Sequence, residues 1–104
     1  MITLSSLGML RIGVVSPELR VADVVFNCER IKQAAIQAEA ADCRFLLFPE
    51  LCVTAYTCGD LFFQPHLIAR AREAVFDLAD FSGSKGLTLV VGAPVSQRGR
   101  LFNC

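Results

Sequence analysis

The sequence "RFLLFPEL", residues 44–51, contains the strand around which we expect the rest of the fold to be built. Residues 45–48 are apolar without the polar–apolar alternation of a half-exposed strand, and such a run is typical of a central strand in a parallel sheet. Pro49 has no N–H to donate to a neighbouring strand, so the strand should end there. Glu50 therefore falls at, or just past, the carboxyl end of the predicted strand.

Two further apolar runs predict strands before and after this one. The run "LRIGVV", residues 10–15, indicates a short buried strand. The run "LTLVVGAPV", residues 87–95, predicts a third strand that Pro94 ends, and "LFNC", residues 101–104, begins another.

A long helical pattern separates the first two strands. Apolar residues recur every three or four positions over residues 21–38, which predicts an amphipathic helix that covers a sheet. Asp23 is its expected N-cap, and Asn27 falls on its polar face. The helix should end near residues 41–43.

A second helical pattern runs from about Pro65 to Phe81, where "SGSKG" is expected to break it. The elements then follow the order strand, helix, strand, helix, strand. This β-α-β-α-β order predicts an α/β fold in which parallel strands are joined by right-handed helical crossovers.

The composition argues against several classes of protein. Ten basic and ten acidic residues cancel without a basic stripe, so we expect no nucleic acid partner. No apolar run approaches the roughly 20 residues of a membrane-spanning helix, so we expect no membrane partner and a cytoplasmic location. The chain has 104 residues, of which 54% are hydrophobic, and a mean hydropathy of +0.51. These values suit strands covered on both faces, or a piece of a larger body.

The five cysteines do not form a metal-binding pattern. No CxxC pair occurs, and the single histidine, His66, has no partner histidine, so we expect no metal site. Reduced, mostly buried thiols are the expectation for such a chain.

Glu50 is the candidate functional residue that its position in the chain selects. Ligands of open α/β sheets bind outside the carboxyl ends of the strands, and a carboxylate partly buried there could act as a general base. The alternative is that Glu50 only caps a turn or accepts hydrogen bonds from loop amides. Cys52 and Cys58 lie close to it in sequence, but the loop contains no basic residue that would favour a nucleophilic thiolate.

Residues 11–103 resemble the amino-terminal part of the nitrilase (carbon–nitrogen hydrolase) superfamily. The resemblance is carried by the early apolar strand, the helix start with Asn27, and "FPEL" followed by Ala55-Tyr56, where the family usually has Gly-Tyr. The longer string "YTCGDLFFQ" is similar to the glutaminase domains of the glutamine-dependent NAD synthetases, and "VVGAPV" and "GRLFN" continue the match.

This resemblance implies an αββα sandwich and a Glu–Lys–Cys catalytic triad. Glu50 matches the triad glutamate, the general base, while Tyr56 and Asp60 match loop positions that shape the pocket entrance or hold the loop. The triad lysine and cysteine match no residue of this chain and would lie beyond Cys104. Residues 1–104 are therefore expected to be a partial carbon–nitrogen hydrolase domain, truncated before these two residues and inactive alone.

The resemblance also implies what a longer parent protein would do. Its substrates would be glutamine and deamido-NAD, and it would use ATP and Mg in a separate synthetase domain, with no cofactor in this segment. We expect the parent to be a homo-oligomer. Two alternatives stay open: a fragment of another nitrilase-family enzyme, such as an amidase or carbamoylase, or a non-catalytic association module.

Overall fold

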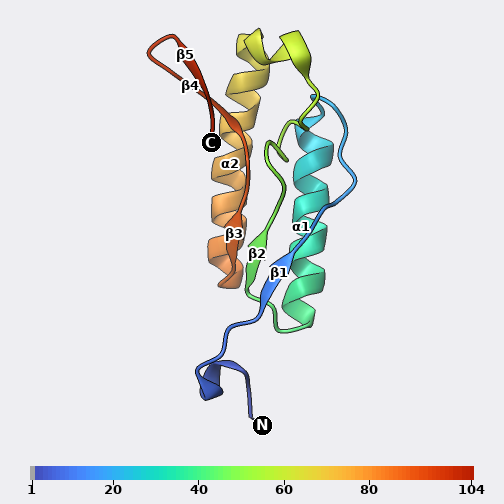
Figure 1. Ribbon diagram of the computed structural model, residues 1–104, viewed down its shortest axis with the longest axis vertical. Coiled ribbons are helices and arrows are strands. Elements are labelled where there is room, and N and C mark those ends of the chain that lie inside the picture. Colours follow the sequence, from blue (N-terminus) through green and yellow to red (C-terminus); the bar gives the residue numbers. More distant parts are fainter. Residues whose placement is uncertain (1) are drawn as a thin grey trace.

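The chain folds into a three-stranded parallel sheet with two α-helices on one of its faces, followed by a two-stranded hairpin (Figure 1). The structure is a computed structural model and describes residues 2–104. Its strands and helices are β1 (Ile12–Val14), α1 (Val24–Ala40), β2 (Phe45–Leu47), α2 (Pro65–Lys85), β3 (Thr88–Val90), β4 (Pro94–Gln97) and β5 (Arg100–Asn103), with the 3₁₀ helices η1 (Ser5–Leu7) and η2 (Gly59–Phe63).

The sheet has the order β1-β2-β3, with β2 in the centre and all three strands parallel. Gly13 of β1 and Leu89 of β3 both pair with Leu46 of β2. The predicted β-α-β-α-β order and the central position of the "RFLLF" strand are confirmed. Parallel neighbours require long crossovers, and α1 and α2 supply them.

The first helix begins where its capping residue predicts. The Asp23 side chain accepts a hydrogen bond from the backbone N–H of Phe26 at 3.1 Å, which satisfies one of the free amides of the first turn. The helix packs Cys28, Ile31 and Ala35 against the sheet. The placement of Asn27 on the polar face is wrong, because this side chain is fully buried.

The second helix runs four residues past the predicted end, because its "SGSK" segment stays helical. The hydroxyls of Ser82 and Ser84 donate to the carbonyls of Ala79 and Phe81, at 3.0 and 2.8 Å, so neither competes for the helix amides. Gly86 ends the helix with a left-handed φ of 64°, the usual conformation at this position.

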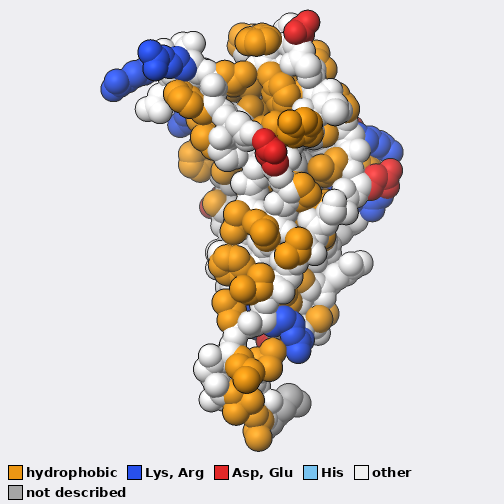
Figure 2. Space-filling view, viewed as in Figure 1, with side chains coloured by type: hydrophobic (Ala, Val, Ile, Leu, Met, Phe, Trp, Pro, Cys, Tyr) orange, Lys and Arg blue, Asp and Glu red, His pale blue; other side chains and the backbone are white. Residues whose placement is uncertain are grey.

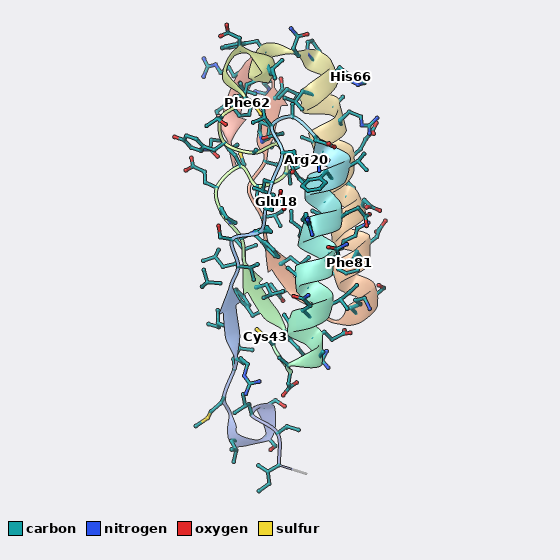
Figure 3. All side chains as sticks on the ribbon, turned by 90° about the vertical axis from the view of Figure 1, so that its right-hand side faces the viewer. Glu18, Arg20, Cys43, Phe62, His66 and Phe81 are labelled. Atoms are coloured by element: carbon teal, nitrogen blue, oxygen red, sulfur yellow. The ribbon has the colours of Figure 1, made fainter. Side chains whose placement is uncertain are left out.

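The sheet is covered on one face only. In the turned view α1 and α2 stand on one side of the strands, and no helix among residues 2–104 covers the other side (Figure 3). Ile12, Val14, Leu47 and Val90 are exposed on the open side. Figure 2 shows hydrophobic side chains along this side of the molecule. The expectation of a buried first strand is wrong, because Ile12 and Val14 are exposed and Gly13 between them is only partly buried.

Pro94 begins a new strand instead of ending the third one. It is the first residue of β4, a place where its missing N–H costs no ladder hydrogen bond. Arg98 and Gly99 form the tight turn to β5, with φ values of 52° and 75°, as a two-residue hairpin of this type requires. Among the described residues, no helix is long and apolar enough to cross a membrane.

Candidate active site

The loop that follows β2 lies directly against the end of β3. The backbone N–H of Val53 donates to the carbonyl of Gly92 at 3.1 Å. A Cβ atom built on Gly92 would lie 2.3 Å from the backbone nitrogen of Leu51 and 3.0 Å from the carbonyl carbon of Glu50. Because these neighbours are backbone atoms that cannot move aside cheaply, only glycine permits this approach.

Asn27 holds the same loop from the opposite side. Its side-chain amide donates to the carbonyls of Arg20 and Val53, at 2.9 and 3.0 Å. Its side-chain oxygen accepts from the backbone N–H of Arg20 at 2.7 Å. A buried polar group is stable only with its hydrogen bonds made, and these three bonds satisfy the buried amide. Asn27 thus ties the segment before α1 to the loop after β2.

Two non-glycine residues of this loop have left-handed backbone conformations. Leu51 has a φ of 53° and Ala55 a φ of 67°, and both are buried. Such conformations cost of order 1 kcal/mol for residues with a Cβ and concentrate at functional sites. Ala55 occupies a position where the nitrilase superfamily usually has glycine. Glycine is also the residue that adopts a positive φ without strain, so this backbone conformation favours glycine as well.

Glu50 lies at the carboxyl end of β2, as predicted, but its side chain is exposed instead of partly buried. Its Oε1 accepts a hydrogen bond from Nδ2 of Asn103, at the end of β5. It borders an open cavity of ≈ 500 Å³. The lining residues are Glu50, Leu51, Tyr56, Thr57, Gly59, Phe62 and Asn103. A carboxylate, an amide and two aromatic rings therefore meet at the strand end.

The other two predicted site residues differ in their relation to this cavity. Tyr56 lines it and is 63% exposed, so its ring is available at the entrance. Asp60 is exposed in the first turn of η2 and is not among the lining residues. The structure thus brings Tyr56 to Glu50 and leaves Asp60 outside. Asn103 was missed by the sequence analysis, since only the return of the hairpin carries it to Glu50.

The cysteines near Glu50 are packing residues. Cys52 is fully buried, and burial raises the pKa of its thiol, which opposes thiolate formation. Cys58 is buried and its Sγ donates to the carbonyl of Thr54 at 3.1 Å. Burial likewise raises the pKa of Cys28 to about 11. All five cysteines are free, so the expectation of mostly buried thiols is confirmed, with Cys104 as the exposed exception.

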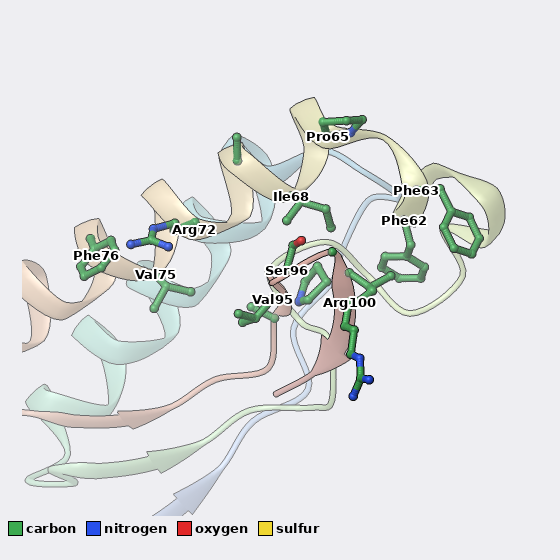
Figure 4. Close-up of a pocket in the computed structure, with 15 residues that line it drawn as sticks. Phe62, Phe63, Pro65, Ile68, Arg72, Val75, Phe76, Val95, Ser96 and Arg100 are labelled. Atoms are coloured by element: carbon green, nitrogen blue, oxygen red, sulfur yellow. The ribbon is translucent and has the colours of Figure 1, made fainter.

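A second cavity, which the sequence analysis did not anticipate, lies between α2 and the hairpin (Figure 4). Its volume is ≈ 650 Å³ and its walls are mostly apolar, with Arg72 and Arg100 among the lining residues. None of the described residues that line this cavity carries a carboxylate or a thiol. Within residues 2–104, no three His, Cys, Asp or Glu side chains come together as a metal site.

Similarity in sequence links the chain to one kind of enzyme. No family model matches it. The glutamine-dependent NAD(+) synthetase of Mycobacterium bovis is 27% identical over 96 residues, which cover 92% of this chain and 14% of that protein. The chain therefore spans only a small part of the length of this curated relative.

Solved structures match the fold. The glutamine-dependent NAD(+) synthetase from Cytophaga hutchinsonii is 32% identical with a TM-score of 0.85, covering 91% of this chain and 16% of that one. A glutamate-to-leucine mutant of an amidase from Nesterenkonia sp. AN1 is 25% identical with a TM-score of 0.73, covering 82% of this chain and 32% of that one. Its structure shows covalent addition of the acetamide moiety of fluoroacetamide at the active site cysteine.

Replacing Gly92 with alanine should destabilise the chain by roughly 3 kcal/mol, because the new Cβ meets the backbone at Glu50 and Leu51. Gly83→Ala is the matched control. A Cβ at Gly83 meets nothing within 4 Å, and alanine favours the helix there by roughly 0.5–1 kcal/mol. Urea unfolding followed by circular dichroism measures both variants, and equal stabilities would contradict the close approach.

Ala55→Gly should stabilise the chain by about 0.5 kcal/mol, because glycine relieves the left-handed strain at a smaller entropic cost. The same change at Ala34, inside α1, should destabilise it by about 1 kcal/mol. The two variants are compared by their urea midpoints. A loss of stability in Ala55→Gly would show that the loop does not hold this backbone conformation.

Proposed function

We propose that this chain, which has the fold of the nitrilase superfamily and is similar to the amino-terminal region of glutamine-dependent NAD synthetases, supplies the glutamate of an amide-hydrolysing site. The observation that carries the proposal is the position of Glu50. Its carboxylate is open to a cavity at the carboxyl end of the central strand, on a loop held by Gly92 and Asn27. The site of a base requires such a fixed backbone.

Glu50 would act as the general base of a Glu–Lys–Cys triad. It accepts the proton of a cysteine thiol as the sulfur attacks the amide carbon, and the proton then passes to the departing ammonia. The carbon–nitrogen bond breaks, a thioester remains, and water hydrolyses it with Glu50 again as base. Proton transfer of this kind contributes about 10²- to 10⁴-fold to a rate. The cysteine adduct of the Nesterenkonia amidase supports thiol chemistry on this fold.

The lysine and cysteine of the triad would come from residues outside 1–104. Lys85 lies in the last turn of α2, which leads into the start of β3, and its Nζ is 3.7 Å from a carboxylate oxygen of Glu39. It therefore belongs to the end of the sheet opposite Glu50. Among the described residues, no cysteine lines the cavity beside Glu50. We infer that residues 1–104 are part of a glutaminase domain.

The complete protein would pass ammonia from glutamine to an ATP- and Mg-dependent domain that amidates deamido-NAD. The match to the Cytophaga hutchinsonii synthetase favours this over an amidase or carbamoylase, because its TM-score and identity exceed those of the amidase. The open sheet face favours one further candidate, an association module, since exposed apolar surface of this kind promotes contact with other chains.

The 104-residue chain alone should release no ammonia from glutamine, because neither a cysteine nor a lysine lines the cavity beside Glu50 among residues 2–104. The measurement is a coupled ammonia assay at high protein concentration. Steady release of ammonia that disappears in Glu50→Gln would contradict the proposal that the lysine and cysteine of the triad lie outside residues 1–104.

A chimera tests the role of Glu50 directly. This chain replaces the segment of the Cytophaga hutchinsonii synthetase that it matches, and NAD formation is measured with glutamine and with free ammonia. We expect Glu50→Gln to lower the glutamine-dependent rate by about 10²- to 10⁴-fold and to leave the ammonia-dependent rate unchanged.

Glu18→Gln is the matched control for the chimera. Glu18 is an exposed glutamate that pairs with Arg30 at 3.2 Å, away from the cavity, and its loss should change neither rate. Because the ammonia-dependent rate reports a folded enzyme, a glutamine-dependent rate that survives Glu50→Gln would overturn the proposed base.

A further inference from the structure

The Glu50 carboxylate has a hydrogen-bond partner that no sequence argument identified. Within residues 2–104, the side chain that donates to it belongs to Asn103, through Nδ2 to Oε1. The two residues are 53 positions apart in sequence. A contact between residues so distant needs both backbones to be held in place, and one short segment after β3 holds both.

Gly92 and Ala93 make up that segment. Glu50 is fixed on one side, where a Cβ on Gly92 would lie 3.1 Å from its Cα. On the other side Ala93 exchanges two backbone hydrogen bonds with Cys104, the residue after Asn103, at 2.8 and 3.1 Å. The adjacent residue, Pro94, pairs with Asn103 itself. Base and amide are therefore anchored to neighbouring residues of the same strand end.

The chemistry of the pair suits a base that must stay available. An ionised carboxylate only accepts hydrogen bonds, and the asparagine amide donates without carrying charge or titrating. It can therefore orient one carboxylate oxygen without the strong pairing that a lysine or arginine would impose. Glu50 lines the same cavity as Tyr56 and Phe62, and its bond to Asn103 is made through Oε1.

We propose that Asn103 is a positioning residue, which holds Oε1 of Glu50 so that the other carboxylate oxygen faces the reacting thiol. This role rests on the proposed function of Glu50 as general base. It differs from a role in hairpin packing, because Asn103 is exposed like the rest of β5 and its side chain donates to Glu50, outside the hairpin.

Side-chain NMR of the 104-residue chain tests the contact without catalysis. With ¹³C-labelled glutamate, Glu50 should show one dominant rotamer in the unchanged chain and averaged couplings in Asn103→Ala. Ser96→Ala, an exposed change in β4 of the same hairpin, should leave the couplings as they are. Couplings unaffected by Asn103→Ala would overturn the proposal.

The chimeric synthetase tests the consequence. Asn103→Ala should lower kcat for the glutamine-dependent reaction about 10- to 100-fold with KM unchanged, because the base is misplaced while substrate binding is kept. Asn103→Asp, which keeps the shape and replaces the donor with a like charge, should lower kcat at least as far. Asn103→Gln, which keeps the amide, should restore part of the rate.

The possible results separate the two proposals. Equal losses in the glutamine- and ammonia-dependent rates of Asn103→Ala would reveal a merely structural residue and overturn the positioning role. A fully active Asn103→Ala beside an inactive Glu50→Gln would overturn the positioning role alone. An active Glu50→Gln would overturn the base, and the positioning role with it.

Discussion

The close approach of the Glu50–Leu51 backbone to Gly92 is the constraint on which the site depends. It lets the loop after β2 lie on the end of β3, where the Val53 amide reaches the Gly92 carbonyl. The buried Asn27 then joins this loop to the start of α1, so three separate segments are locked into one unit. Fixing a loop in this way costs conformational entropy, which the buried hydrogen bonds and the packed core around Val53 offset.

The elements that local physics decides could be predicted from the sequence. The central strand, the two helices and the Asp23 cap follow from apolar spacing and from one side chain bonding a nearby amide. Burial of Asn27 could not be predicted, because its partners, Arg20 and Val53, lie in other segments. The strand that begins at residue 101 was predicted, and β5 confirms it. Its partner β4 was not, since the apolar run across Pro94 suggests a single third strand.

The same distinction between local and long-range features applies to the candidate site. The place of the candidate site follows from the rule that ligands of parallel sheets bind at the carboxyl ends of the strands, and Glu50 lies just past such an end. What surrounds the carboxylate depends on the register of β5 against β4 and on the contact of Gly92 with the loop. These are long-range facts, so the sequence could not have indicated Asn103 as a partner or excluded Asp60 from the cavity.

Glu50 lies close to the apolar face of the sheet. Leu47, the last residue of β2, and Glu50 are three positions apart, and both are exposed. A second layer that covered Leu47 and Val90 would stabilise the fold by roughly 25 cal/mol for each Å² of apolar surface that it removes from water. A carboxylate at the rim of that layer would lose water at the same time, and one that loses water needs a hydrogen-bond donor. The Asn103 side chain already gives the Glu50 carboxylate such a donor.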